Sequence, residues 1–207
     1  MKHKKYIGEY LDVFKDCLDH VNPAIPSDEQ HGPWRRRLYE TNTYLGMLSH
    51  ISSNLKNKSI LDLGTWRGGS AFMLGENKQN IVHSYDITDH KLPFVKSYLN
   101  HRYPNIIFNI KSCLDIPSEE LKNASLIYLD LAPHDGIKEE QMISNIRQSG
   151  FEGLLMCDDV SINKVMYDWW NSVEEEKVHG IDDGGKTALG DRIGFAFFSE
   201  ESKNLLR

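Results

Sequence analysis

Six short apolar segments, separated by stretches of helical periodicity, constrain the fold of this chain more than any other feature. Most are continuous runs of branched and aromatic residues, which is typical of strands that helices cover on both faces. Helices are expected between them, near residues 69–77, 90–100, 138–148 and 162–174. This order predicts an α/β fold with a Rossmann-like, doubly wound and mostly parallel sheet. The expected strands are 59–63, 81–86, 106–110, 125–130, 153–157 and 193–198.

The 207 residues suit one such domain with a helical extension at its N-terminus. Residues 1–33 are predicted to form the extension, with a helix near 4–20 and a linker that contains prolines. The domain itself is expected to cover residues 34–207 and to begin with a helix near 34–55. Ligands of such sheets bind beyond the carboxyl ends of the strands, so polar residues at those ends are the candidates for function.

The charge balance narrows the range of partners. A formal net charge of −6 provides no basic field that would attract nucleic acid or an anionic membrane. No segment approaches the ~20 apolar residues that a membrane span needs, and no signal-peptide pattern follows the N-terminus. We therefore predict a cytoplasmic protein that binds neither nucleic acid nor membranes.

A glycine-rich turn follows the first expected strand. Gly64 allows a tight bend and a close approach of a ligand, and the N–H groups at the following helix start suit an anionic group. An aspartate before the turn would repel a pyrophosphate and attract an ammonium group, and the G-x-G-x-x-G spacing of dinucleotide-binding proteins is missing. The alternative is a plain strand-to-helix turn. The candidate binding residues are Asp62, Gly64, Thr65, Trp66, Arg67, Gly68, Gly69 and Ser70.

Acidic residues also follow the next two expected strands. Asp86 ends the second strand about 20 residues beyond the turn, where an acid commonly accepts hydrogen bonds from the hydroxyl groups of a ribose. Cys113 and Asp115 follow the third strand, where an acid could accept a hydrogen bond from an adenine amino group. A turn or capping role for Asp115 is the alternative.

Residues 62–70, with the sequence DLGTWRGGS, resemble motif I of the class I S-adenosylmethionine (SAM)-dependent methyltransferases. The form Gly-Thr-aromatic-x-Gly-x-Ser is similar to that of cation-dependent O-methyltransferases of the catechol, caffeoyl-coenzyme A and macrolide-sugar types. The wider class has a glycine where Trp66 stands, and the catechol-like branch tolerates an aromatic residue there. The resemblance covers residues 34–198 in its order of elements and implies SAM as cofactor, with Asp130 among the residues near it.

Three aspartates follow the fourth and fifth expected strands, whose ends should be close in a parallel sheet. Three carboxylates in a partly buried pocket require a cation, and oxygen ligands favour Mg²⁺. In the resembling family, aspartates at these places hold Mg²⁺, which assigns Asp130, Asp158 and Asp159 as metal ligands. Helix capping by Asp158 or Asp159 is the alternative.

The resemblance further implies methyl transfer to a hydroxyl group of a small molecule, which needs a base. In the resembling family, the base is a lysine that follows the metal-binding aspartate by a few residues. This sequence has no lysine at the matching position, but His134 aligns with it when one inserted residue is allowed. Asp135 is the second candidate, and an ordinary turn with a solvated histidine is the alternative. Relatives are often dimers, so a homodimer is compatible with the resemblance.

Two other functions fit the same residues. One is a metal-binding relative that transfers no methyl group, of the hydroxylase-associated type known from cephalosporin biosynthesis, and the other is a nucleoside-binding module without catalysis. An NAD-dependent dehydrogenase fits poorly because of Asp62 and the missing fingerprint. A glycine-rich loop, residues 182–192, can cover the pocket, while Tyr167, Trp169 and Trp170 are expected in the core.

Overall fold

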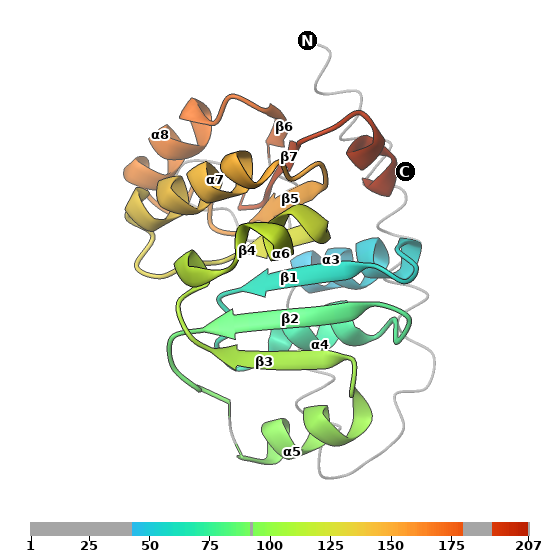
Figure 1. The fold of residues 1–207 in the computed structure, drawn as a ribbon. Coiled ribbons are helices and arrows are strands. Elements are labelled where there is room, and N and C mark those ends of the chain that lie inside the picture. The colour runs from blue at the N-terminus through green and yellow to red at the C-terminus, as the bar shows by residue number, and fades with distance from the viewer. Residues whose placement is uncertain (1–42, 92, 180–191, 207) are drawn as a thin grey trace.

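A seven-stranded sheet forms the centre of the computed structural model, which describes residues 43–91, 93–179 and 192–206 (Figure 1). The strand order is β3-β2-β1-β4-β5-β7-β6, and the first five strands along the chain pair in parallel. Only β7 is antiparallel to its neighbours β5 and β6. The strands are β1 (Ser59–Leu63), β2 (Ile81–Asp86), β3 (Ile106–Ile110), β4 (Ala124–Leu129), β5 (Leu154–Cys157), β6 (Glu176–His179) and β7 (Gly194–Phe197).

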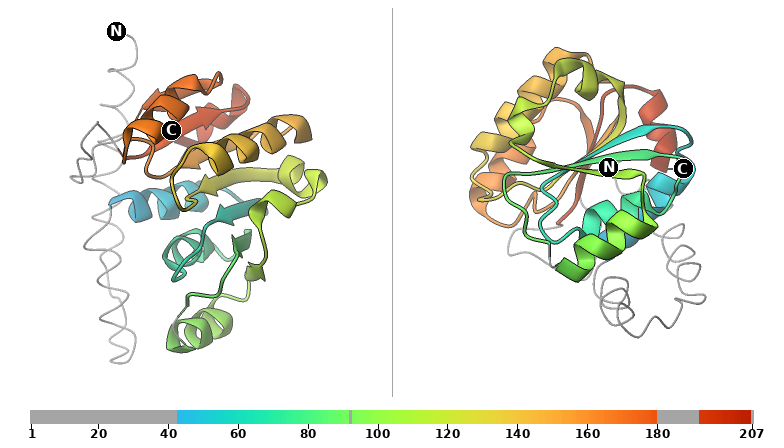
Figure 2. Two further views of the ribbon diagram at one scale, coloured as in Figure 1. Left: turned by 90° about the vertical axis from the view of Figure 1, so that its left-hand side faces the viewer. Right: turned by 60° about the horizontal axis from the view of Figure 1, so that its bottom comes forward.

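Helices cover both faces of this sheet (Figure 2). Alternate strand residues enter two separate cores, one shared with α3 (Thr43–Asn54), α4 (Gly69–Gly75) and α5 (Pro93–Arg102). The other core is shared with α6 (Ser118–Asn123), α7 (Ile137–Ser149) and α8 (Lys164–Ser172). Two 3-10 helices, η1 (Cys113–Asp115) and η2 (Glu201–Leu206), complete the described part. The doubly wound α/β fold expected from the apolar runs is confirmed.

The six expected strands are all present, with ends that differ by one residue or less. The sequence did not reveal β6, because Glu176–His179 is short, polar and placed at the edge of the sheet. It also missed the six-residue helix α6. Trp169 and Trp170 are buried as expected, whereas Tyr167 is exposed.

Several expectations concern residues outside the described part of the chain. These are the helix near 4–20, the linker, the boundary between residues 33 and 34, the first part of the helix near 34–55, and the loop 182–192 apart from its last residue. No described helix combines the length and the apolar character that a membrane crossing requires.

Glu139 is a buried carboxylate on the first turn of α7. Its carboxylate has no side-chain hydrogen-bond partner among the described residues, and burial raises its pKa. The folded state therefore binds this proton more tightly than the unfolded chain. The stability that the bound proton contributes is fully present below pH ~4.3, the ordinary pKa of a glutamate, and is lost as pH rises through the raised pKa of the folded state. We expect Glu139→Gln to raise the free energy of unfolding by about 1 kcal/mol at pH 8 and by almost nothing at pH 4.

Urea denaturation at both pH values measures this difference. The matched control is Glu152→Gln, because Glu152 is an exposed carboxylate near the end of the same connection to β5. A Glu139→Gln variant whose stability relative to wild type is the same at both pH values would contradict the prediction.

Candidate active site

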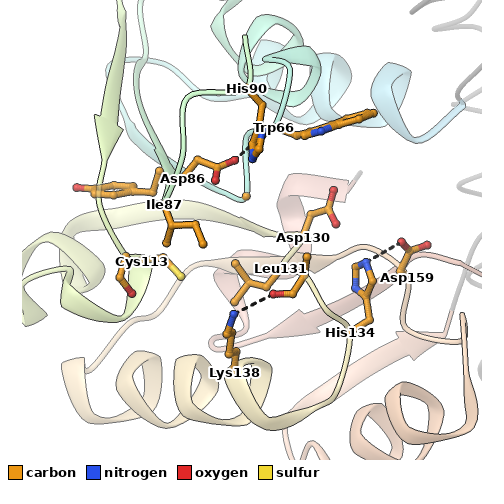
Figure 3. A pocket seen from close by; sticks show the side chains of 14 residues that line it. Trp66, Asp86, Ile87, His90, Cys113, Asp130, Leu131, His134, Lys138 and Asp159 are labelled. Atoms are coloured by element: carbon orange, nitrogen blue, oxygen red, sulfur yellow. Dashed lines mark hydrogen bonds and ion pairs between the residues drawn. The ribbon is translucent and has the colours of Figure 1, made fainter.

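A cavity of about 450 Å³ opens at the carboxyl ends of β1, β2 and β4 (Figure 3). Its size is in the range of small-molecule sites. Of the residues predicted from sequence, some line this cavity and others support it from behind. The lining residues from the prediction are Gly64, Trp66, Asp86, Cys113, Asp130, His134 and Asp159.

The turn after β1 sets the position of this cavity. Gly64 adopts a left-handed backbone with φ of 97°, and a Cβ at this position would lie 1.8 Å from the carbonyl oxygen of Asp130. The N–H groups of Gly64 and Thr65 donate to the carbonyl oxygen of Tyr85, at 2.9 and 3.3 Å. The turn thus packs directly on the ends of β2 and β4, so Asp86 and Asp130 come to the same cavity.

Asp62 supports the turn and does not line the cavity. Its side chain is fully buried and accepts hydrogen bonds from the hydroxyl groups of Thr65 and Ser84. Burial raises the pKa of this carboxyl group, and the hydroxyl groups of Thr65, Ser70 and Ser84 oppose that effect. The other predicted turn residues that do not line the cavity are Thr65, Arg67, Gly68, Gly69 and Ser70.

Asp86 and Trp66 form the rim between β1 and β2. The N–H of Trp66 donates to Asp86 Oδ2 at 2.8 Å, and the N–H of Thr88 donates to Oδ1 at 3.2 Å. Trp66 is 59% exposed, and the guanidinium of Arg67 lies 4.5 Å from the centre of its ring. Each carboxylate oxygen of Asp86 accepts only one of these bonds, so both keep capacity for hydroxyl groups of a ligand.

Apolar groups line the side of the cavity next to Asp86. The exposed side chain of Ile87, the buried thiol of Cys113 and the side chain of Leu131 lie there (Figure 3). Burial raises the pKa of the Cys113 thiol to about 11, so this group stays neutral at physiological pH. Asp115 is exposed and does not line the cavity.

Of the three aspartates expected to converge, Asp130 and Asp159 line the cavity and Asp158 does not. The side chain of Asp158 is fully buried and forms a two-point ion pair with Arg192, at 2.5 and 2.7 Å. The hydroxyl of Tyr128 donates to the same carboxylate at 3.0 Å. Asp158 thus lies behind the cavity wall, and its charge is compensated within the protein.

Asp130 and Asp159 face the cavity, together with His134. One ligand atom from each of the three residues lies within 4.8 Å of the other two, and His134 Nε2 is 3.5 Å from Asp159 Oδ2. Burial raises the pKa of Asp130 well above its usual value, and the charges of Asp158 and Asp159 add to this effect. Trp66, His134 and Asp159 all have left-handed backbones although none is glycine, and such strain is common at functional sites.

Asp135, the second base candidate, accepts the N–H of Ile137 at 3.0 Å at the start of α7 and does not line the cavity. This bond to the N–H two residues ahead forms an Asx turn before Gly136, the N-cap residue of α7. Lys138 lines the cavity instead, and its ammonium group donates to the carbonyl oxygen of Ala132 at 3.1 Å.

Sequence reasoning missed several lining residues and one supporting residue. Ile87 and Ser112 are direct neighbours of predicted residues, so adjacency could have indicated them. Nothing in the sequence pattern indicated Lys138 or His90, and Arg192 appeared only as the end of a glycine-rich loop. The lining residues missed were Tyr85, Ile87, His90, Ser112, Leu131, Ala132 and Lys138.

Comparison of the structure with solved structures finds the same fold in methyltransferases. A SAM-dependent O-methyltransferase from Thermotoga maritima superposes with a TM-score of 0.55 over 74% of this chain and 64% of its own, at 12% sequence identity. A TehB-like SAM-dependent methyltransferase from Corynebacterium glutamicum gives 0.52 over 84% and 97%, at 19% identity. An rRNA methylase from Streptococcus thermophilus gives 0.50 over 74% and 95%, at 10% identity.

At sequence identities this low, the structural similarity establishes the fold but not the substrate or the reaction. The chain has the fold of class I SAM-dependent methyltransferases, as residues 62–70 predicted. No protein-family model matches the sequence, and no curated protein sequence matches it significantly.

Proposed function

We propose that this protein is a SAM-dependent O-methyltransferase whose acceptor is a small hydroxylated molecule. The observation that supports this function best is the shared cavity of Asp86 and Asp130, which the Gly64 turn brings together at the carboxyl edge of a methyltransferase fold. Strand ends of this kind are where open α/β sheets bind their ligands.

The two sides of the cavity differ in the way that the two halves of SAM differ. Ile87, Cys113 and Leu131 offer apolar contacts to an adenine ring, next to the carboxylate of Asp86 for the ribose hydroxyl groups. Asp130 and Asp159 lie on the opposite side, where their negative charge would stabilise a sulfonium and an ammonium group. The residues present therefore fit this cofactor.

The charge of the cavity favours a small, uncharged acceptor over RNA. Asp86, Asp130 and Asp159 all line it, and the whole chain has a net charge of −6, so phosphate groups would be repelled. An acceptor hydroxyl held beside Asp130 and His134 would lie next to groups that favour loss of its proton. Methyl transfer from a sulfonium needs such a hydroxyl to be aligned with the methyl group.

A divalent cation belongs to this proposal, with Asp130 and Asp159 as its carboxylate ligands. When bound, such a cation makes an attached hydroxyl more acidic and fixes its direction. Asp158, the third ligand predicted from sequence, is left out of this proposal, since Arg192 already compensates its charge.

Calorimetry with S-adenosylhomocysteine tests the cofactor directly. We expect one binding site per chain, and Asp86→Ala to weaken binding by about 10- to 100-fold because hydrogen bonds to a charged group are lost. The matched control is Asp115→Ala, which removes an exposed carboxylate outside the cavity and should change the affinity less than about twofold. Wild-type protein that binds no S-adenosylhomocysteine at millimolar concentration would refute the cofactor assignment.

Methyl transfer is tested separately, with radiolabelled SAM and a panel of catechols, sugars and other polyols. Transfer to at least one hydroxyl group is expected. Cofactor binding without transfer to any acceptor would favour the hydroxylase-associated or non-catalytic alternatives.

A further inference from the structure

Asp130, His134 and Asp159 bring donor atoms from three different parts of the fold to one side of the cavity (Figure 3). Asp130 follows β4, His134 lies in the connection to α7, and Asp159 follows β5. The separation of 3.5 Å between His134 Nε2 and Asp159 Oδ2 suits two ligands about 2.1 Å from one ion at a roughly tetrahedral angle.

Arg192 decides which carboxylate oxygens are available. Its guanidinium binds both oxygens of Asp158, and its Nε lies 3.0 Å from Asp159 Oδ1. The other oxygen of Asp159, Oδ2, faces His134. Asp159 can therefore act as a ligand through Oδ2 without breaking its ion pair, whereas Asp158 would first have to lose its buried partner.

The carboxylate of Asp130 has no ion-pair partner among the described residues. The guanidinium of Arg192 forms ion pairs with the neighbouring carboxylates of Asp158 and Asp159. The half-buried side chain of Asp130 accepts no hydrogen bond from the described residues, although it points into the cavity (Figure 3). A carboxylate in this position is stabilised most by a cation that binds beside it.

We propose that Asp130, His134 and Asp159 are the protein ligands of a divalent transition-metal ion, in which His134 takes the place expected for Asp158. This inference deepens the proposed function and rests on it for the role of the ion in catalysis. His134 is then a metal ligand and not the general base predicted from sequence. An imidazole nitrogen beside two carboxylates favours Co²⁺, Zn²⁺ or Fe²⁺ over Mg²⁺, which prefers oxygen ligands only.

Metal binding by the full-length chain, stripped with EDTA, tests the inference without an activity assay. Co²⁺ is the probe, followed by its visible absorption and by calorimetry, with Mg²⁺ as competitor. We expect one Co²⁺ per chain and at least about tenfold weaker binding of Mg²⁺. His134→Ala should weaken Co²⁺ binding by about 10- to 100-fold and remove most of the preference over Mg²⁺.

Two further variants separate the new ligand set from the old one. Asp135→Asn changes the residue next to His134. The side chain of Asp135 forms the turn before α7 and does not line the cavity, so this variant should leave Co²⁺ affinity within about twofold. Asp158→Asn should leave it within about threefold, because Asp158 is not a ligand. The opposite pattern, with Co²⁺ binding lost in Asp158→Asn and kept in His134→Ala, would overturn the inference in favour of the three-aspartate site.

Circular dichroism melting confirms that each variant is folded. The side chain of His134 is 22% exposed and lies in a loop, so its replacement leaves both cores intact. The His134→Ala variant therefore decides whether His134 is a metal ligand, even if Asp158→Asn does not fold. S-adenosylhomocysteine binding is measured on the same wild-type preparation. Cofactor binding without Co²⁺ binding would refute only the metal inference, and Co²⁺ binding without cofactor binding would refute only the proposed function.

Discussion

Gly64→Ala is expected to lower the free energy of unfolding by at least about 3 kcal/mol and to abolish binding of S-adenosylhomocysteine. The added Cβ would lie 1.8 Å from the carbonyl oxygen of Asp130, which is backbone and cannot move aside as a flexible side chain would. The φ of 97° adds conformational strain for any residue with a Cβ. Relief of this contact would push the turn away from β4 and change the cavity.

Gly150→Ala provides the matched control for this prediction. Gly150 also has a left-handed backbone, with φ of 75°, but a Cβ there meets no atom within 4 Å. The free energy of unfolding of this variant should fall only by the cost of a left-handed backbone for a residue with a Cβ, about 1 kcal/mol. Urea denaturation measures both; equal losses in the two variants would show that the contact with Asp130 is not what requires glycine at position 64.

Arg192→Leu is expected to lower the free energy of unfolding by about 3–5 kcal/mol, because it leaves the buried carboxylate of Asp158 without its partner. Arg192 holds that carboxylate at two points, and the side chain of Asp158 has no exposed surface. Leucine offers neither a charge nor a donor in place of the guanidinium, so the carboxylate of Asp158 loses its ion-pair partner. Asp158→Asn added to the same chain should recover a large part of the loss, since position 158 then carries no charge.

An exposed ion pair serves as the control for Arg192→Leu. Lys164 and Asp168 are four residues apart on α8, with side chains 79% and 57% exposed. Lys164→Ala should therefore cost less than about 0.5 kcal/mol. Chemical denaturation of the three variants tests the set, and a loss below about 1 kcal/mol for Arg192→Leu would mean that the pair with Asp158 is not formed in solution.

The fold was predictable where the local sequence shows which residues are buried. Six strands appeared as apolar runs because helices cover both of their faces. β6 did not, because it lies at the edge of the sheet and begins with two charged residues, Glu176 and Lys177. Its place depends on pairing with β7, which comes 15 residues or more later in the chain.

The candidate site was predictable where a residue ends a strand, and less so elsewhere. Asp86 and Asp130 both reach the cavity because parallel strands end at one edge. Lys138 reaches it only because the first turn of α7 folds back toward Ala132. Contacts of that kind depend on the path of a loop, which composition and spacing do not specify.

The sequence alone determined the α/β class, the glycine turn and the presence of acidic groups at the carboxyl edge, because each follows from local chain preferences and from burial. Only the tertiary structure decided between Asp158 and Asp159, two identical and adjacent residues. The left-handed backbone of Asp159 directs its side chain to the cavity, while Arg192, 34 residues from Asp158, holds that carboxylate in the interior. Charge compensation between distant segments exists only after the chain has folded.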